Sequence, residues 1–279
     1  MAAIRLLLSL LTGLCAYYFY SQETLSPFKP PEMVRGKRVL VTGSSTGIGE
    51  QIAYEFARMG AHLLLTARRE KQLKEVAQKC LELGASSARH VVSDMNNLTS
   101  AQNVIEDARN KLRGLDYLVL NHVGGSGRFG PFQGDMAAVT SSMTVNFLSY
   151  VQLTVSAMTM LQESQGSIIV ISSLSGRIGA PFTLSYSAAK FALEGFYSSL
   201  RRELRLREIS LSVTVAVLGY IDTAKVDCWF TRLPHHLSSI PHNSCYGFDV
   251  LFVPPTASIP APSTGTESLK TRLCVQWEH

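Results

Sequence analysis

The sequence is poor in cysteine and in charged residues. Its 279 residues include 5 cysteines, and none of them forms a Cys-x-x-Cys pair or stands in a cluster with histidine. That pattern excludes a cysteine-based metal site and a disulfide framework, and His235, His236 and His242 lack companion ligands as well. Charged residues make up 17% of the chain. Their one dense stretch, 201–208, interleaves both signs without aromatic neighbours, which predicts a solvated helix face and no nucleic-acid site.

The sequence also lacks an apolar run of the roughly 20 residues that a free-standing transmembrane helix needs. Its N-terminal apolar stretch, 6–20, is close in length to a signal-peptide core, and small residues would permit cleavage after Cys15. The aromatic cluster at 17–20 instead suits a membrane interface and an uncleaved anchor. We therefore expect a signal peptide or signal-anchor at 1–20 and a linker at 21–35. Because Arg5 precedes the stretch and Glu23 follows it, the rest of the chain is expected in the lumen of the endoplasmic reticulum or, after cleavage, outside the cell.

Between these ends, short apolar runs alternate with amphipathic stretches. Strands are predicted at 37–42, 61–66, 88–92, 115–120, 166–172 and 211–218, and helices at 47–59, 70–83, 99–113, 137–163 and 186–207. This alternation predicts an α/β fold of the Rossmann type: one domain, 36–224, with a doubly wound parallel sheet between two helical layers. Ligands of such folds lie at the carboxyl ends of the strands.

A glycine-rich turn follows the first predicted strand. Gly43, Gly47 and Gly49 have the spacing Gly-x-x-x-Gly-x-Gly and lead into a helix. Glycines at such a turn let the backbone approach a pyrophosphate, which the helix N-terminus attracts. The turn alone is a weak sign of a dinucleotide site, because its spacing departs from the commonest fingerprint.

A second motif, Ser173 with Tyr186 and Lys190, makes that sign strong. On a helix, Tyr186 and Lys190 share one face, and the ammonium would favour the phenolate of a tyrosine whose pKa is otherwise about 10. Ser173 ends the fifth predicted strand, where its hydroxyl can hold a carbonyl or alcohol oxygen beside the phenol. These groups suit the interconversion of an alcohol and a ketone by hydride transfer. A Tyr-x-x-x-Lys pair on a solvated helix face is the alternative, and the glycine turn argues against it.

Together the motifs resemble the short-chain dehydrogenase/reductase family, from the N-terminus to about Ala224. The resemblance implies that Ser173, Tyr186 and Lys190 are catalytic with Asn146, that Ser173 and Tyr186 bind substrate, and that two copies form a dimer through the fourth and fifth helices. Asn121-His-Val-Gly124 stands where the family usually has Asn-Asn-Ala-Gly. The implied cofactor site comprises Gly43, Ser45, Thr46, Gly47, Ile48, Gly49, Arg68, Arg69, Asp94, Met95, Asn121, His122, Val123, Tyr186, Lys190, Ile221 and Thr223. Within the family, the N-terminal segment and several motifs resemble hydroxysteroid dehydrogenases, which implies a steroid-like substrate and a membrane anchor in the endoplasmic reticulum.

The end of the second strand indicates which cofactor is used. An acidic residue there would bind the ribose hydroxyls of NAD, whereas an arginine would pair with the 2′-phosphate of NADP. The sequence has Arg68, with Arg69 in reserve, so we predict NADP; two ordinary exposed arginines are the alternative. Thr46 stands where many NADP-preferring relatives carry a second base. Asp94 is predicted to touch the adenine ring, or else to cap the end of the third strand.

The last segment, 225–279, departs from the family. Proline, serine and threonine dominate its later part without an apolar period, so we expect a largely disordered tail and an incomplete C-terminal part of the fold. Two functions stay open at this point. The chain is either an NADP-dependent oxidoreductase of a hydrophobic alcohol or ketone, or a weak or inactive nucleotide-binding variant that lacks the segment covering the substrate.

Overall fold

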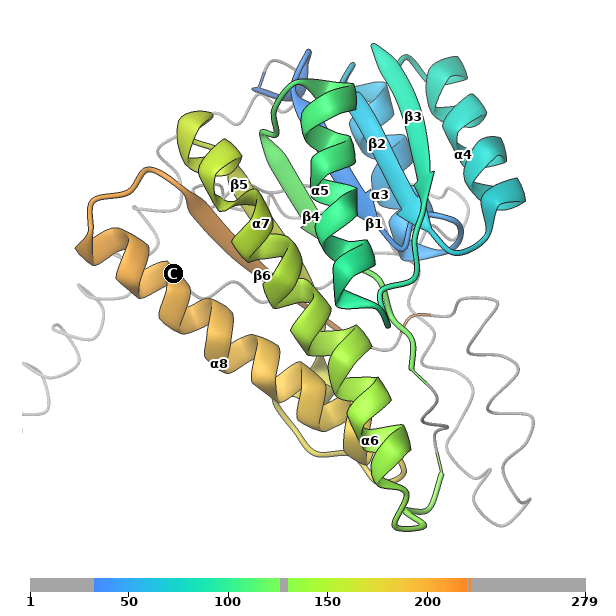
Figure 1. Ribbon diagram of the computed structural model, residues 1–279, viewed down its shortest axis with the longest axis vertical. Helices are drawn as coiled ribbons and strands as arrows, with labels where there is room; N and C mark the ends of the chain where they lie inside the picture. Colours follow the sequence, from blue (N-terminus) through green and yellow to red (C-terminus); the bar gives the residue numbers. More distant parts are fainter. Residues whose placement is uncertain (1–32, 126–129, 220, 222–279) are drawn as a thin grey trace, which may run out of the picture.

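The computed structural model describes residues 33–125, 130–219 and 221, and these form one three-layer α/β domain around a parallel sheet (Figure 1). The sheet has six strands in the order β3-β2-β1-β4-β5-β6. All five pairings are parallel, and the strand order reverses between β1 and β4. The strands are β1 Arg38–Thr42, β2 His62–Ala67, β3 Ser87–Val92, β4 Tyr117–Leu120, β5 Ser167–Ser173 and β6 Ser212–Leu218. The predicted fold class is confirmed, with each predicted strand in place.

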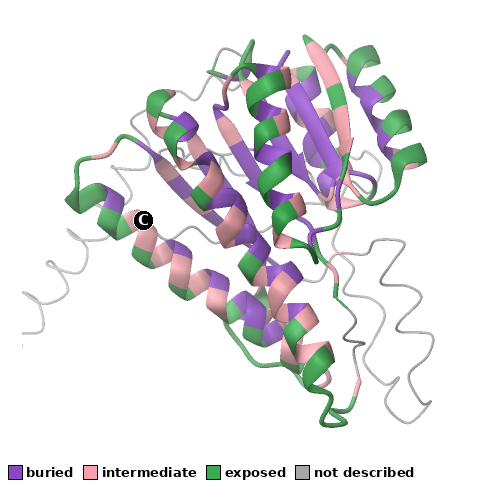
Figure 2. Ribbon diagram, viewed as in Figure 1, coloured by how far each residue is buried: buried purple, intermediate pink, exposed green. Residues whose placement is uncertain are grey.

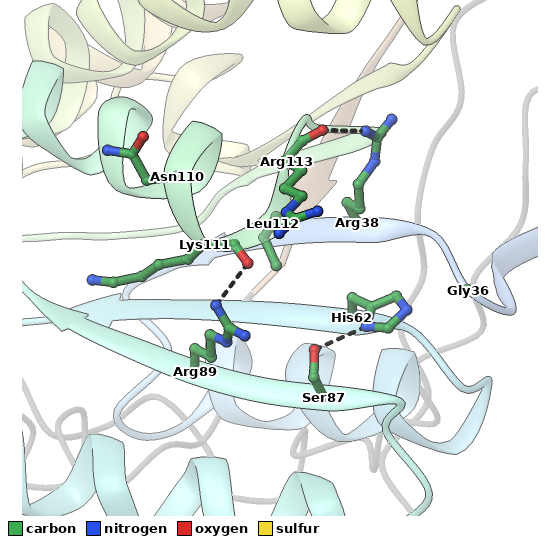
Figure 3. Close-up of a pocket in the computed structure, with 9 residues that line it drawn as sticks. All are labelled: Gly36, Arg38, His62, Ser87, Arg89, Asn110, Lys111, Leu112 and Arg113. Atoms are coloured by element: carbon green, nitrogen blue, oxygen red, sulfur yellow. Dashed lines mark hydrogen bonds between the residues drawn. The ribbon is translucent and has the colours of Figure 1, made fainter.

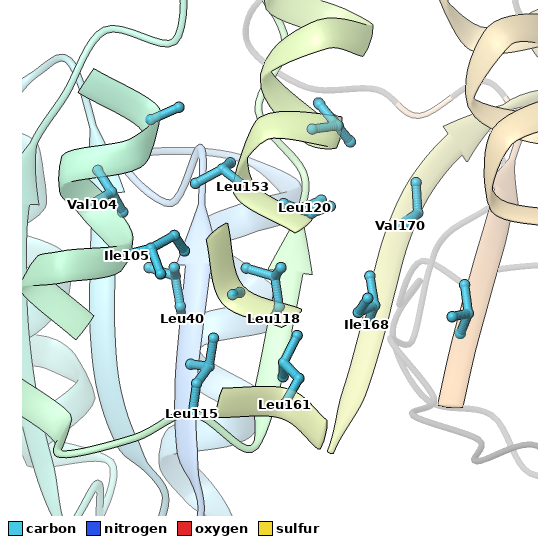
Figure 4. Close-up of a cluster of buried hydrophobic side chains, with 14 of the residues drawn as sticks. Leu40, Val104, Ile105, Leu115, Leu118, Leu120, Leu153, Leu161, Ile168 and Val170 are labelled. Atoms are coloured by element: carbon cyan, nitrogen blue, oxygen red, sulfur yellow. The ribbon is translucent and has the colours of Figure 1, made fainter. Parts of the chain in front are cut away.

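Helices cover both faces of the sheet. They are α3 Ile48–Arg58, α4 Glu70–Glu82, α5 Leu98–Leu112, α6 Met136–Met143, α7 Ser149–Glu163 and α8 Leu184–Leu206. Two apolar clusters fill the space between the layers, one under α3 and α4 and one under α5, α7 and α8. Figure 4 shows the second cluster, in which Leu118, Ile168 and Val170 of the sheet meet Ile105 of α5 and Leu153 of α7.

The central strands are buried on both faces, as the near-continuous apolar runs predict (Figure 2). Successive strand side chains point to opposite faces. Leu40 accordingly belongs to one apolar cluster, and its neighbours Val39 and Val41 belong to the other.

The long helix predicted at 137–163 is interrupted. A π-helical segment, Thr144–Leu148, separates α6 from α7. The helix starts where Asp135 caps it, because the Asp135 carboxylate accepts hydrogen bonds from the backbone N–H groups of Ala137 and Ala138. Apolar periodicity cannot reveal the interruption, since a π turn adds one residue without breaking the run of helical backbone.

Several predictions concern residues outside the described part of the chain: the N-terminal segment 1–20, the linker up to residue 32, Thr223 and the tail 225–279. Among the described residues, no helix has the length and apolarity that crossing a membrane requires. The same residues contain no group of three or more histidine, cysteine or acidic side chains arranged to hold a metal ion.

Candidate active site

The motif residues lie along one edge of the sheet. Gly43 follows β1, Asn121 follows β4, Ser173 ends β5 and Gly219 follows β6. Because all strands are parallel, these positions share the carboxyl edge (Figure 1). The edge includes the point between β1 and β4 where the strand order reverses, which is where open α/β sheets bind their ligands.

The glycine turn is pressed against the loop after β4. Gly43 has a φ of +66°, and a Cβ there would lie 2.7 Å from the His122 Cα. A Cβ on Gly49 would lie 2.4 Å both from the Gly43 oxygen and from Asn121 Nδ2. No side chain caps the start of α3, where Gly47 is the N-cap residue. The turn therefore leaves backbone N–H groups and the positive end of α3 for a ligand, which fits a dinucleotide pyrophosphate.

Asn121 stabilises the glycine turn through hydrogen bonds to its backbone. Its side-chain amide donates hydrogen bonds to the backbone oxygens of Thr42 (3.2 Å) and Gly43 (3.3 Å). Its own backbone N–H donates to the Thr42 hydroxyl at 2.9 Å. In the structure Asn121 therefore holds the glycine turn in place, and its predicted contact with the cofactor stays a prediction.

His122 is buried, and its ring hydrogen-bonds two hydroxyls on different elements. One ring nitrogen, Nδ1, lies 2.9 Å from the Thr42 hydroxyl, and the other, Nε2, lies 2.7 Å from the Ser149 hydroxyl. Burial, reinforced by the nearby charge of Lys190, lowers the pKa of His122 to about 3, so its ring is neutral at physiological pH. The imidazole thus links the end of β1 to the start of α7 and does not face the open edge.

Asn146 lies in the π-helical segment with 1% of its surface exposed. Its side chain accepts a hydrogen bond from the Gly124 N–H (3.1 Å) and donates to the Gly124 oxygen (2.8 Å) and to the Ser142 oxygen (2.9 Å). The side chain therefore fixes the loop after β4 to the helix. These contacts place Asn146 in the site without showing the proton relay that the family resemblance implies.

Ser173, Tyr186 and Lys190 meet at the ends of β5 and α8. Lys190 Nζ lies 5.6 Å from the centre of the Tyr186 ring, and Ser173 hydrogen-bonds the Tyr186 hydroxyl. Lys190 is 1% exposed and donates a 2.7 Å hydrogen bond to the Ile171 backbone oxygen. Tyr186 and Ser173 are each partly exposed as residues, whereas Lys190 is buried.

The electrostatics of the trio differ from the expectation that Lys190 lowers the pKa of Tyr186. Burial raises the pKa of Tyr186, and the hydrogen bond with Ser173 opposes part of that rise. Burial also lowers the pKa of Lys190 to about 7, with the Glu194 carboxylate pulling it back up. The ammonium is therefore only partly populated at neutral pH, and its effect on the phenol is smaller than helical spacing alone suggests.

The two arginines after β2 reach different parts of the edge. Arg69 Nη2 donates hydrogen bonds to the hydroxyls of Thr46 (2.7 Å) and Ser45 (3.1 Å), both in the glycine turn. Arg68 Nη2 instead lies 4.0 Å from where a Cβ of Gly124 would be, beside the loop after β4. The sequence analysis favoured Arg68 over Arg69 as the arginine that binds the 2′-phosphate. In the structure it is Arg69 that hydrogen-bonds the glycine turn.

The remaining predicted cofactor residues have other surroundings, away from the hydrogen bonds of the glycine turn and of the trio. Asp94 is exposed and accepts a hydrogen bond from the Asn96 N–H, as an end-of-strand cap does, and Met95 is buried in the core. Val123 is exposed on the loop after β4. Ile221 packs against the apolar cluster under α3 and α4, and Ile48 does the same. Thr223 lies outside the described residues.

Two residues near Lys190, Tyr150 and Glu194, belong to the site although no sequence motif marks them. Tyr150 is fully buried, donates a 2.6 Å hydrogen bond to the His122 oxygen, and has Lys190 Nζ 5.5 Å from its ring centre. Glu194 forms a 2.9 Å ion pair with Arg177. Its spacing of four from Lys190, after the spacing of four from Tyr186, could have indicated it.

A pocket of about 440 Å³ opens at the opposite, amino edge of the sheet (Figure 3). It is lined by Gly36, Arg38, His62, Ser87, Arg89, Asn110, Lys111, Leu112 and Arg113. Its arginines already serve the fold, because Arg89 donates to the Lys111 oxygen and Arg38 to the Arg113 oxygen and to Asp116. This pocket contains none of the motif residues, so its size does not make it the active site.

Comparisons with known proteins show the family of the chain. Residues 37–231 match the short chain dehydrogenase family. Hydroxysteroid 11-beta-dehydrogenase 1-like protein A of Xenopus laevis is 68% identical over 224 residues, which cover 80% of this chain and 76% of that protein. The corresponding protein of Danio rerio is 45% identical over 217 residues, covering 77% of this chain and 74% of its own length.

Solved structures share the architecture. A metagenomic short-chain oxidoreductase in complex with NADP is 27% identical, with a TM-score of 0.60 over 67% of this chain and 82% of that one. NADH-dependent reductase A1-R′, complexed with NAD, has a TM-score of 0.64 at 24% identity, over 69% of this chain and 82% of its own. The second likeness concerns the fold alone.

Proposed function

The chain belongs to the short-chain dehydrogenase/reductase family, and on that premise we propose that it is an NADP-dependent oxidoreductase of a hydrophobic, steroid-like alcohol or ketone. Family membership makes it an oxidoreductase of CH–OH groups that uses a nicotinamide dinucleotide. The choice of NADP over NAD and the steroid-like substrate are proposed in addition to this. The observation that carries it is the meeting of Ser173, Tyr186 and Lys190 on the same sheet edge as the glycine turn.

The chain's own residues divide the chemistry among them. Ser173 orients the substrate oxygen, and Tyr186 donates a proton to it or accepts one from it. Lys190, held by the Ile171 oxygen, supplies positive charge next to the phenol. A bound nicotinamide dinucleotide supplies or accepts the hydride.

Two arginines support NADP over NAD. Among the described residues, no carboxylate pairs with Arg68 or Arg69, and the end of β2 carries no acidic side chain. Structural relatives are described with NADP and with NAD, so the fold does not choose between the two cofactors. A guanidinium that no carboxylate neutralises matches the charge of a 2′-phosphate.

The steroid-like substrate is supported by the curated relatives. Proteins of Xenopus laevis that are 68% and 70% identical to this chain are named hydroxysteroid 11-beta-dehydrogenase 1-like. Ser173 and Tyr186, both partly exposed residues, are where the substrate oxygen would bind.

An inactive nucleotide-binding variant is the second candidate. The match to the Xenopus protein leaves about a fifth of this chain, and about a quarter of that protein, outside the aligned region. Since substrate pockets draw on segments beyond the nucleotide fold, loss of turnover with retained cofactor binding is the expected behaviour of such a variant.

One experiment separates the two candidates. NADPH binding to the full chain is measured by nucleotide fluorescence, and turnover is then followed with a panel of hydroxysteroids and ketosteroids. Binding with turnover supports the enzyme, and binding without turnover supports the variant. Failure to bind either NADPH or NADH would contradict both.

For the location of the chain, we propose the endoplasmic reticulum, with the described domain in the lumen. The support is the charge asymmetry around the N-terminal apolar segment and the sequence Asn97-Leu-Thr99, which is an acceptor for N-glycosylation. Asn97 is exposed at the start of α5. Expressed in cells, the chain should lose apparent mass on glycosidase treatment, and Asn97→Gln should abolish that shift. An unshifted chain that is accessible to protease in intact microsomes would place the domain in the cytosol.

We also propose that two copies pair through α7 and α8. Val155 and Phe191, on these two helices, are exposed apolar side chains and support the proposal. Sedimentation of the purified chain should give twice the monomer mass, and Val155→Lys should reduce it to the monomer.

A further inference from the structure

The ammonium of Lys190 is buried and lies over two aromatic rings. Its Nζ is 5.5 Å from the centre of the Tyr150 ring and 5.6 Å from the centre of the Tyr186 ring. Both distances are within the roughly 6 Å at which the negative face of an aromatic ring attracts a cation. Lys190 forms no ion pair with another described residue and donates one hydrogen bond, to the Ile171 oxygen. Since an ammonium has three donors, one backbone oxygen leaves much of the buried charge for other groups to stabilise.

The titratable groups around Lys190 stabilise this charge only in part. Glu194, one turn further along α8, raises the pKa of Lys190, but its carboxylate is already paired with Arg177 at 2.9 Å. His122, on the loop after β4, is neutral, because burial and the charge of Lys190 lower its pKa to about 3. Burial raises the pKa of Tyr186, so its phenol is neutral as well. The aromatic faces are therefore the main support of the ammonium besides its one backbone hydrogen bond.

Tyr150 differs from Tyr186 because the proposed reaction makes no use of its hydroxyl. Tyr150 is fully buried, and burial raises the pKa of its phenol well above the ordinary 10. The hydroxyl donates a 2.6 Å hydrogen bond to the His122 oxygen, and the centres of the two rings lie 4.3 Å apart. The His122 ring is itself held by the hydroxyls of Thr42 and Ser149. The Tyr150 ring is thus fixed in position and stays uncharged beside the ammonium.

We infer that Tyr150 is a positioning residue for the reaction: its ring holds the Lys190 ammonium in place and keeps it protonated next to Tyr186. The inference rests on the proposed function, because it names a residue that acts through a member of the catalytic trio. Since Tyr150 is fully buried on α7, it acts on the reaction through Lys190 and not by touching the substrate.

The test measures the protonation of Lys190 directly. The full chain is isotopically labelled at the lysine ε-carbons, and the Lys190 resonance, identified by its loss in Lys190→Met, is followed by NMR as the pH is changed. In the unmutated chain the midpoint should lie at about 7. Tyr150→Leu, which removes the ring, should lower the midpoint by about one pH unit, the size expected for the loss of one desolvated cation–π contact. Tyr150→Phe keeps the ring and should change the midpoint far less.

Tyr197→Leu is the matched control. Tyr197 is also a fully buried tyrosine, and its hydroxyl hydrogen-bonds Thr154 at 2.8 Å, but no cation of the described residues lies over its ring. Tyr197→Leu should therefore lose stability much as Tyr150→Leu does and leave the Lys190 midpoint unchanged.

A fluorinated ring tests the inference even if Tyr150→Leu does not fold. Tyr150→pentafluorophenylalanine nearly keeps the shape of phenylalanine, but the fluorine atoms withdraw the negative charge from the ring face. The Lys190 midpoint should fall relative to that of Tyr150→Phe.

The outcomes separate the inference from the function beneath it. An unchanged midpoint in the Tyr150 ring variants, or an equal fall in Tyr197→Leu, would overturn the inference while leaving a dinucleotide-dependent oxidoreductase in place. If the proposed function is correct, the loss of turnover at high pH should move to lower pH together with the midpoint. A lowered midpoint in a chain that turns over no substrate would support the inference and contradict the proposed function.

Discussion

The two edges of the sheet treat their cations in opposite ways, since Arg38 at the amino edge is partly exposed and Lys190 at the carboxyl edge is buried. At the amino edge, Arg38 is paired with Asp116 through contacts of 2.8 and 3.0 Å to the carboxylate. At the carboxyl edge, Lys190 has no carboxylate within ion-pair distance among the described residues and is held by a backbone oxygen. Burial lowers the pKa of Lys190 to about 7, and the Glu194 carboxylate only partly opposes this.

This contrast separates groups that stabilise the fold from groups that are free for chemistry. A matched pair lowers the energy of the folded chain and resists change, whereas a buried, unmatched ammonium is costly and easily deprotonated. The size of a pocket does not distinguish the edges, because the 440 Å³ pocket lies at the amino edge (Figure 3). What distinguishes the two edges is whether the cation is paired with a carboxylate, as Arg38 is, or only with a backbone oxygen, as Lys190 is.

The largest effect is expected at the carboxyl edge. Tyr186→Phe keeps the ring and removes only the hydroxyl, so turnover should fall by at least about 100-fold while NADPH binding and folding persist. Ser173→Ala should lose a similar factor, because Ser173 hydrogen-bonds that hydroxyl. Steady-state kinetics with a steroid substrate provide the measurement. Undiminished turnover in Tyr186→Phe would remove the trio from the mechanism.

The second effect is a pH dependence that only the unmatched cation should cause. The pKa of Lys190 is about 7 in the folded chain against 10.5 ordinarily, so between these values the unfolded chain binds more protons. The stability of the unmutated chain should therefore rise with pH in that window by a few kcal/mol at most, relative to Lys190→Met. Urea unfolding at pH 7, 8, 9 and 10 measures the difference. Parallel stability profiles for the two chains would show that Lys190 is not perturbed.

The smallest effect is expected at the amino edge, on stability alone. Burial would raise the pKa of Asp116, but the hydrogen bonds from Arg38 outweigh it and hold that pKa below its ordinary 3.8. Asp116→Asn should destabilise the chain by roughly 1.5–3 kcal/mol at neutral pH, a loss that shrinks as the pH falls through the folded pKa.

The matched control for that variant is Asp107→Asn. Its partner Lys111 and Asp107 itself are each about one-third exposed, so less than about 1 kcal/mol should be lost. Cofactor binding should be unaffected in both variants. A change in NADPH affinity in Asp116→Asn would mean that the two edges are coupled.

Strand and helix positions were predictable because their signals are local. Each of the six apolar runs became a strand, and the helices began and ended within a few residues of their predicted limits. The parallel order follows from the alternation of strands with helices. The π segment at Thr144–Leu148 was not predictable from local spacing; within it, Asn146 hydrogen-bonds Gly124, which lies 22 residues away.

The site was predictable only where a motif fixes spacing. The helical spacing of Tyr186 and Lys190 correctly placed them on one face of α8, near Ser173. The expected lowering of the pKa of Tyr186 was wrong in direction, because burial raises that pKa and helical spacing does not reveal burial. Likewise, Arg69 and Arg68 are neighbours in the sequence, and only the fold shows which one reaches the glycine turn.

The π segment also restricts how the chain can vary in length. An α-helix turns by about 100° per residue, so one residue more or less changes the direction of every side chain beyond it. Deleting one residue within Thr144–Leu148 would restore regular helix, but it would rotate α6 relative to α7 by about that angle. Asn146 could then no longer reach Gly124 while Ser149 still met His122. At this point of the chain, the number of residues, and not only their identity, is therefore constrained by the contacts that Asn146 and Ser149 make.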